Sequence, residues 1–252
     1  MNKVLKFFIW RYLSIQLVFY KLTGTGSFGR KKAIYIDQLE LEKPNPLKNA
    51  MIKHHVKQYH EASCSVASVA SVINSVTEVV NGIQPQVISQ MDLLDNVREA
   101  HWKERMEPEG YGGKRGLPLS VFGDVVKSSF HVYKLPYQKI DVVQTSRKPE
   151  EAELIKEKLR NRLIEYEKDV SAVIIAHFNQ GVYLKALQIP HISPVGGYDI
   201  ESDMVTILDV DYLQKKHYQV SFDRFYEGLS NNYNFLFRAH GFDSGGYVYI
   251  KL

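Results

Sequence analysis

Cysteine is nearly absent from this chain of 252 residues, because Cys64 is the only one. A single cysteine excludes an internal disulfide and the zinc sites that need paired cysteines. Low-complexity segments and internal repeats are also lacking. The remaining composition, with 44% apolar and 24% charged residues, is typical of one compact globular domain.

A strong charge of either sign is absent too, since the net charge is only +4 and the pI is near 8.9. A basic surplus can favour nucleic acid or a membrane surface. Here, however, the Lys and Arg residues are interspersed with acidic residues along the chain. The composition therefore predicts no nucleic-acid partner.

Long uncharged apolar runs are missing from the N-terminal segment, residues 1–22, although it is rich in apolar residues. Lys6 and Arg11 interrupt it, and the longest uncharged run, Tyr12 to Tyr20, is far short of the ~18–20 residues of a membrane span. Three interpretations stay open: a secretory signal, an interfacial helix in contact with a membrane, or a helix packed on the domain. The protein would accordingly be exported, membrane-associated or cytoplasmic.

The rest of the chain divides into an entry segment and a main domain. The glycines of TGTGSFGRKK predict a flexible connection, and Pro44 and Pro46 predict an irregular stretch in EKPNPLKN. We therefore expect a linker over 23–49 and the folded domain over 50–252.

The stretch QYHEASCSVASVASV contains the cysteine and predicts a helix that starts at it. Ser63 is the expected N-cap, and burial must hold this helix because its β-branched residues are poor helix formers. The apolar residues that recur at helical spacing are Val66, Val69, Ala70, Ile73 and Val76.

Later segments predict further helices, followed by strands. We expect helices over 119–126 and 149–168, with Pro149 in the first turn of the second. Helices first and an antiparallel sheet afterwards indicate an α+β fold. The expected strands cover 131–135, 171–178, 191–199, 204–211, 234–241 and 245–252.

The strands 191–199 and 204–211 are expected to form a hairpin across the turn IESD. Residues whose numbers add to about 400–404 then face each other, which brings His191 close to Asp209. Pro194 and the glycine pair after it predict a bulge, which leaves the register open by about one residue.

These residues could form a cysteine nucleophile site. A helix N-terminus favours the thiolate of Cys64, and a neighbouring imidazole, His191, can act as base and acid while Asp209 fixes its tautomer. Gln58 and the backbone N–H of Cys64 could stabilise an oxyanion. Each residue alone also fits a structural role, so the prediction depends on their joint order.

The same residues resemble two motifs of the phytochelatin synthase family. Gln58 lies six residues before Cys64, and SVASVASVIN after it is similar to the family's nucleophile helix. HISPVGGYDIESDMVTILDVD, from His191 to beyond Asp209, is similar to the second motif, and GLPLSVFGDVVKSS, from Gly116, to the helix between them.

The resemblance implies a papain-like cysteine peptidase fold, with a helical part carrying Cys64 packed on an antiparallel sheet carrying His191 and Asp209. It also implies cleavage of the Cys–Gly bond of glutathione through a γ-glutamylcysteinyl thioester on Cys64, with Gln58 as an oxyanion donor. The acyl group passes to a second glutathione, which forms phytochelatin, or to water. No cofactor is implied, because metals enter as thiolate complexes of the substrate.

Three positions depart from the family pattern. Tyr212 replaces an Arg three residues after the Asp, Asn179 ends a strand where an Arg is usual, and Ser65 replaces the Gly after the Cys. The chain lacks the Cys-rich C-terminal domain of plant members and resembles the short bacterial forms. We therefore expect hydrolysis of glutathione, or limited transfer.

Two rival functions stay open: a papain-like peptidase or amidase for another peptide, and a non-enzymatic, membrane-associated interaction protein. Two other patterns are interpreted as structural. GYGGKRG, from Gly110, lacks the ending of a phosphate loop and predicts a flexible loop near the active cleft. His54, His55 and His60 do not have the spacing of a helix-face metal pair, so we expect no metal site.

Overall fold

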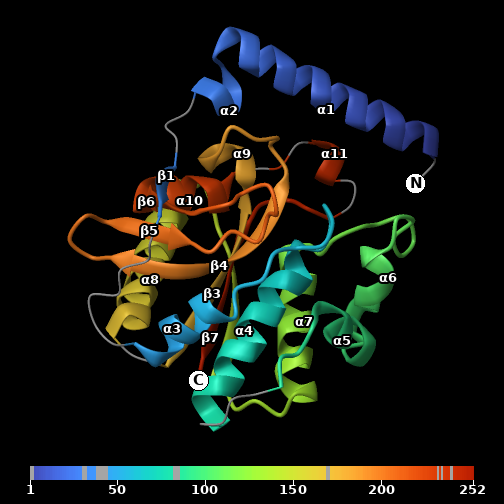
Figure 1. Ribbon diagram of the computed structural model, residues 1–252. Helices are drawn as coiled ribbons and strands as arrows, with labels where there is room; N and C mark the ends of the chain where they lie inside the picture. Colours follow the sequence, from blue (N-terminus) through green and yellow to red (C-terminus); the bar gives the residue numbers. More distant parts are fainter. Residues whose placement is uncertain are drawn as a thin grey trace.

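The fold is built on one antiparallel sheet with helices on both faces (Figure 1). The computed structural model describes residues 3–29, 33–37, 45–81, 86–168, 171–231, 233, 235–238 and 241–252. The strand order is β1-β6-β5-β4-β3-β7-β2, and every neighbouring pair of described strands is antiparallel. The strands are β1 (Ile34–Ile36), β2 (Lys139–Gln144), β3 (Ala172–Asn179), β4 (Pro190–Asp199), β5 (Met204–Ile207), β6 (His217–Ser221) and β7 (Gly246–Lys251).

Two groups of helices cover the sheet, so the architecture is α+β as the sequence predicts. Helices α3 to α7 pack on one face, and α8 to α10 pack on the other. The described helices are α1 (Lys3–Thr23), α2 (Gly26–Gly29), α3 (Pro46–Lys53), α4 (Cys64–Asn81), α5 (Gln90–Asn96), the 3-10 turn η1 (Glu99–His101), α6 (Trp102–Met106), α7 (Leu119–Val132), α8 (Pro149–Lys168), α9 (Gln180–Tyr183), α10 (Phe222–Ser230) and α11 (Phe235–Arg238).

Strand β3 lies between β4 and β7 and is buried along its whole length. Val173 and Ile175 point to the α4 side, whereas Ile174 and Ala176 point to the α8 side. Because both faces of the sheet are covered, the strand is a continuous apolar run, as predicted from SAVIIAHF.

Helix α4 is buried on all sides from Ser65 to Val76. A β-branched residue costs a helix less than about 0.7 kcal/mol in propensity, whereas burying a Val side chain contributes about 1.5–3 kcal/mol. Burial therefore decides the conformation, and the helix begins at Cys64 as predicted.

Helix α7 is longer than expected and removes the strand predicted over 131–135. It continues to Val132, and Lys134, two residues beyond its end, lies in the left-handed region at φ 52°. The N–H of Leu135 then bonds to the carbonyl of Phe130 at 2.9 Å, which is the Schellman pattern usually marked by glycine. No glycine signals this end in the sequence.

Two other local predictions are wrong. Pro46 starts helix α3 instead of breaking the chain, because Asn45 caps the helix and proline needs no N–H partner at its first position. The strand predicted over 234–241 contains a helical turn instead, Phe235–Arg238. Residues 234, 239 and 240, like 30–32 and 38–44 of the expected linker, lie outside the described residues.

The expected connection after the first segment is also partly helical, since α2 covers Gly26–Gly29. The expected division into an N-terminal segment over 1–22, a linker over 23–49 and a folded domain over 50–252 stays a prediction. By contrast, Pro149–Lys168 is a helix with the predicted limits, and the C-terminal segment forms β7.

The hairpin between β4 and β5 has the predicted register. Tyr198 faces Val205, Val195 faces Ile207, and a bulge lies between Val195 and Gly197. Strand β5 nevertheless ends at Ile207, earlier than predicted. Asp209 therefore belongs to the segment after the strand.

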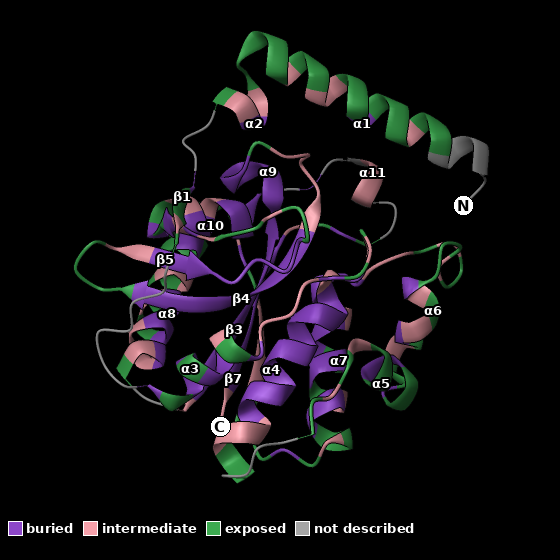
Figure 2. Ribbon diagram, viewed as in Figure 1, coloured by how far each residue is buried: buried purple, intermediate pink, exposed green. Residues whose placement is uncertain are grey.

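Helix α1 runs across one end of the molecule, above the ends of the central strands (Figure 1). Most of its surface is exposed, as Figure 2 shows, while Leu13 is buried against the body. Within the described part of the chain, no helix has both the length and the apolar character to cross a membrane.

Candidate active site

The site begins at the first turn of α4, where Cys64 is partly buried. The carbonyl of Ser63 accepts the first helical bond, from the N–H of Ala67 at 3.1 Å. The hydroxyl of Ser63 instead accepts the N–H groups of Tyr59 and His60, at 3.1 and 3.0 Å. Ser63 thus occupies the predicted N-cap position, but its side chain holds the preceding loop.

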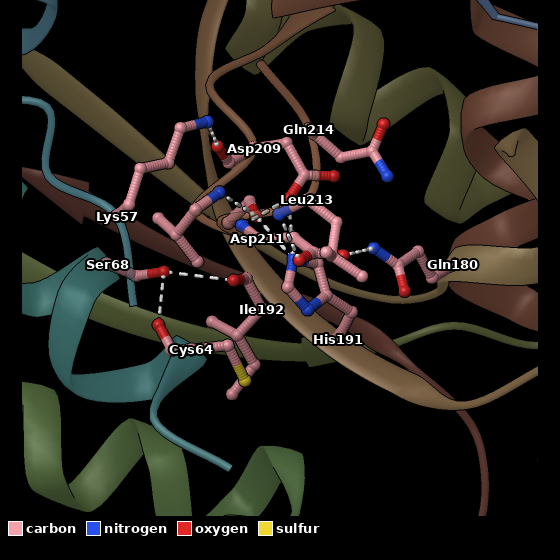
Figure 3. Close-up of polar contacts among 12 residues, drawn as sticks. Lys57, Cys64, Ser68, Gln180, His191, Ile192, Asp209, Asp211, Leu213 and Gln214 are labelled. Atoms are coloured by element: carbon pink, nitrogen blue, oxygen red, sulfur yellow. Dashed lines mark hydrogen bonds and ion pairs between the residues drawn. The ribbon is translucent and has the colours of Figure 1, made fainter. Parts of the chain in front are cut away.

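Two serines that follow Cys64 fix the helix to its neighbours. Ser65 accepts a hydrogen bond from the indole of Trp102 at 3.0 Å and is buried. The hydroxyl of Ser68 lies 2.8 Å from the Cys64 carbonyl and 3.0 Å from the Ile192 carbonyl, as Figure 3 shows. Ser68 therefore connects the nucleophile helix to strand β4, directly beside His191.

His191 and Asp209 are in contact, as the predicted hairpin requires. Nε2 of His191 lies 2.8 Å from Oδ1 of Asp209, and both side chains are buried. The hydroxyl of Ser193 is 3.1 Å from the same ring nitrogen. Nδ1 is therefore the nitrogen left for other partners, and the sulfur of Cys64 lies on a different side of the ring from Asp209 (Figure 3).

The carboxylate of Asp209 is held by three donors. Its Oδ1 also accepts the N–H of Asp211 at 2.8 Å, and its Oδ2 accepts the hydroxyl of Tyr218 at 2.7 Å. Its backbone carbonyl accepts Lys57 Nζ at 2.5 Å and faces Nε2 of His55 at 3.1 Å. This saturation fixes the side chain in one orientation despite its complete burial.

The electrostatics of the pair favour the charged forms. Burial works against a charged His191, but the Asp209 carboxylate and then the Cys64 side chain raise the pKa of His191 to about 10. Burial would raise the pKa of Asp209, yet His191 and Tyr218 lower it. The imidazole is therefore protonated at neutral pH, beside an ionised carboxylate.

A cavity of about 220 Å³ opens beside Cys64. Among the described residues of its wall, Arg115 is the cation, and it pairs with Glu61 of the same wall at 2.9 Å. Burial lowers the pKa of His177 to about 4, so that ring is neutral. Gly113 and Gly116 also line it, so the GYGGKRG loop lies at the cleft as predicted. The apolar lining includes Ile9, Trp10, Leu13, Leu117, Ile189, Ile192, Phe237 and Phe242.

Gln58 is near the pair but outside the lining of this cavity. Its backbone N–H donates to the Val210 carbonyl at 2.8 Å, next to Asp209. Its side chain is buried, and its Oε1 has no hydrogen-bond partner. The oxyanion role of Gln58 stays a prediction.

Asn179 and Tyr212, which replace arginines of the family pattern, differ in their exposure to solvent. Asn179 is buried, where it caps α9 through the N–H of Gly181 and donates to Asn231 at 3.2 Å. Tyr212 is half exposed. Neither side chain supplies the positive charge of the family's arginines, whereas Arg115 provides one from another loop.

Several supporting residues were missed by the sequence interpretation. Ser193 follows His191 by two residues, a spacing that places both on one face of a strand and could have indicated it. Tyr218 carried no such signal, because strand β6, on which it lies, was not predicted. The sequence pattern did not single out Lys57 either. The contact of Lys57 with Asp209 joins residues 152 positions apart. Tyr218 is nearer in sequence, and strand β6 places it against Asp209.

Among the described residues, no group of three or more His, Cys, Asp or Glu side chains has the arrangement of a metal site. His54 contacts Glu78 at 2.6 Å, His55 faces Asp209, and Nδ1 of His60 accepts the N–H of Ala62 at 3.0 Å. The three histidines therefore have separate surroundings.

An α+β fold that sets a cysteine at a helix start beside a buried histidine–carboxylate pair has the composition of a thiol nucleophile site. The chain matches the family model of phytochelatin synthase over residues 46–235, which is more than half of its length. It therefore belongs to the phytochelatin synthase family. A comparison with curated proteins gave no match.

Family membership implies an acyltransferase that moves γ-glutamylcysteinyl groups, with glutathione as its substrate. The matched range contains Gln58, Cys64, His191 and Asp209. The residues that the two motifs single out thus lie within the part of the chain that defines the family.

Proposed function

We propose that the protein cleaves the Cys–Gly bond of glutathione by a Cys–His–Asp mechanism on a papain-like fold. Cys64 is the nucleophile, His191 is the acid and base, and Asp209 orients the imidazole. The observation that carries this proposal is the His191 ring, which contacts Asp209 at 2.8 Å and whose pKa is raised by both Asp209 and Cys64.

The reaction follows from these groups in two steps. The thiolate of Cys64 attacks the amide carbonyl, and the protonated His191 delivers a proton to the departing glycine nitrogen. The product is a γ-glutamylcysteinyl thioester. His191 then takes a proton from water or from a second glutathione, which attacks the thioester and frees Cys64.

The oxyanion of the tetrahedral intermediate needs preorganised donors. The backbone N–H of Cys64, at the free N-terminal end of α4, is one candidate. The side-chain amide of Gln58 is the other. Its position six residues before Cys64, with its backbone bonded to Val210 next to Asp209, is what supports this role for Gln58.

Hydrolysis is favoured over polymerisation. The family's two arginines are replaced by Asn179, which is buried, and by Tyr212. Arg115 is then the candidate for the substrate carboxylate, since its Nε is buried without a hydrogen-bond partner while its Nη1 pairs with Glu61 at 2.9 Å. One such cation suits a single bound glutathione better than a donor and an acceptor together.

The test is incubation of the purified protein with glutathione, following glycine, γ-glutamylcysteine and phytochelatin by mass spectrometry. We expect glycine and γ-glutamylcysteine in equal amounts, with little phytochelatin, and no release by Cys64→Ala. Release of glycine by Cys64→Ala at the wild-type rate would contradict the mechanism.

A second candidate, a peptidase or amidase for another peptide, is favoured by the apolar lining of the cavity beside Cys64. Cleavage of apolar peptides by wild type, without release of glycine from glutathione, would support it. A non-enzymatic role would instead be indicated by an alkylation rate of Cys64 equal to that of a free thiol at every pH.

A further inference from the structure

Helix α1 carries two neighbouring apolar stripes, one turned to the body of the molecule and one exposed. The inner residues, Ile9, Leu13, Gln16, Leu17 and Tyr20, follow each other at steps of three, four or one and are partly or fully buried. The outer stripe consists of Phe8, Tyr12, Ile15, Phe19 and Leu22, at steps of three and four, with exposed fractions between 48% for Tyr12 and 81% for Leu22. Such a contiguous apolar stripe on an exposed helix indicates a partner.

The charge of this helix selects the partner. Helix α1 contains Lys3, Lys6, Arg11 and Lys21 and no acidic residue, and the first acid in the chain is Asp37. A second copy of the helix would bring like charges together, which is unfavourable. A bilayer with anionic lipids offers both an apolar layer and the opposite charge.

The dimensions and composition of α1 fit a helix that lies on a membrane. Its 21 residues give a length of about 31 Å, and its aromatic residues are of the kind enriched at membrane interfaces. Within the described residues, no helix is long and apolar enough to cross a bilayer.

We propose that α1 binds the surface of an anionic bilayer through the outer stripe and its basic residues. Ile9, Trp10 and Leu13 of the same helix line the cavity beside Cys64. Membrane binding therefore places this cavity next to the lipid surface, with α1 between them. The proposal is independent of the reaction at Cys64, because it depends on α1 alone.

Vesicle flotation of the full chain tests the proposal, with phosphatidylcholine vesicles compared to vesicles that also contain phosphatidylglycerol. We expect at least 10-fold tighter binding to the anionic vesicles, weakened by salt. The double variant Ile15→Glu/Phe19→Glu should lose at least 10-fold in binding. Replacing Arg11 or Lys21 by Gln should cost about 5-fold each.

The matched control is Leu154→Glu/Val87→Glu, which places the same charges at other exposed apolar positions, 70% and 61% exposed. It should bind vesicles like wild type, and the circular dichroism spectrum should show that every variant is folded. Equal binding to both kinds of vesicle, no binding, or equal loss in the control would overturn the proposal. A different result would also overturn it: wild type binds no vesicles but forms a dimer in sedimentation velocity, and Ile15→Glu/Phe19→Glu dissociates that dimer.

Discussion

At the residue scale, the state of His191 depends on its contact with Asp209. A buried imidazole in neutral surroundings loses its proton, as His177 does with its pKa of about 4. His191 is buried as well, yet its pKa rises to about 10 because the Asp209 carboxylate outweighs the cost of burial. The same side chain thus has opposite charge states at two buried positions.

Asp209→Asn should therefore abolish the raised pKa of His191. We expect kcat/KM for glutathione to fall by about 10²–10⁴-fold, and the alkaline limb of the pH profile to move from about pH 10 to lower pH. Asp211→Asn is the control, because Asp211 is also buried but bonds to Gln180 and Leu213 instead of His191. An unchanged alkaline limb in Asp209→Asn would contradict the role of Asp209.

Arg115 gives a second prediction at this scale. Arg115→Gln should raise KM for glutathione about 10-fold and leave kcat nearly unchanged, since a charged hydrogen bond to a carboxylate would be lost in ground and transition states alike. Lys114→Gln, an exposed cation of the same loop, should change neither constant. The KM for glutathione with amidated carboxylates is the further measurement. If Arg115→Gln raises this KM as much as it raises the KM for glutathione, Arg115 binds no carboxylate.

At the element scale, the distance between nucleophile and imidazole is set by the packing of α4 on β4. One hydroxyl, that of Ser68, reaches the Cys64 carbonyl and the Ile192 carbonyl across this contact. Ser68 touches neither reacting group, so it is a positioning residue. Ser68 contributes to catalysis by holding α4 and β4 in their relative positions.

Ser68→Ala should lower kcat about 10-fold and stability by about 1 kcal/mol. Ser75→Ala is the control, because Ser75 is equally buried but bonds only within α4, to the carbonyl of Ser71 at 2.6 Å. Ser75→Ala should lower the free energy of unfolding by a similar amount and leave kcat unchanged. The pH dependence of Cys64 alkylation gives an independent measurement: a profile in Ser68→Ala identical to wild type would argue against positioning.

At the scale of the whole molecule, buried histidines make stability depend on pH in opposite directions. His177 has a lowered pKa, so the unfolded chain binds more protons between about pH 4 and 6.5, and stability falls as pH falls through this range. His191 has a raised pKa, so its stabilising effect is complete below pH 6.5 and is lost as pH rises toward 10. Stability should therefore be greatest near pH 6.5.

Urea denaturation between pH 4 and 10 measures this dependence. His177→Gln should remove about 3 kcal/mol of the loss between pH 6.5 and 4, because one pKa unit corresponds to about 1.4 kcal/mol. Asp209→Asn should flatten the alkaline side instead. Parallel curves for wild type and His177→Gln in the acid range would show that His177 is not the group responsible.

The candidate site was largely predictable from sequence because its signals are local. The start of α4 at Cys64, the hairpin and its bulge near Gly197 follow from helical spacing, turn residues and strand alternation. These patterns also place His191 beside Asp209. The end of α7 at Val132 and the start of α3 at Pro46 were mispredicted, because left-handed Lys134 decides the first and the capping residue Asn45 decides the second.

The sequence by itself determined the α+β class, the buried strand β3, and the order of Cys64, His191 and Asp209, because short-range periodicity and spacing specify them. Only the tertiary structure decided that Tyr218 and Lys57 hold Asp209, and that α1 covers the cavity beside Cys64. The contact of Lys57 and the position of α1 join segments far apart in the chain, and the contact of Tyr218 requires the pairing of β6 with β5. They depend on which faces pack together, and no local pattern encodes that choice.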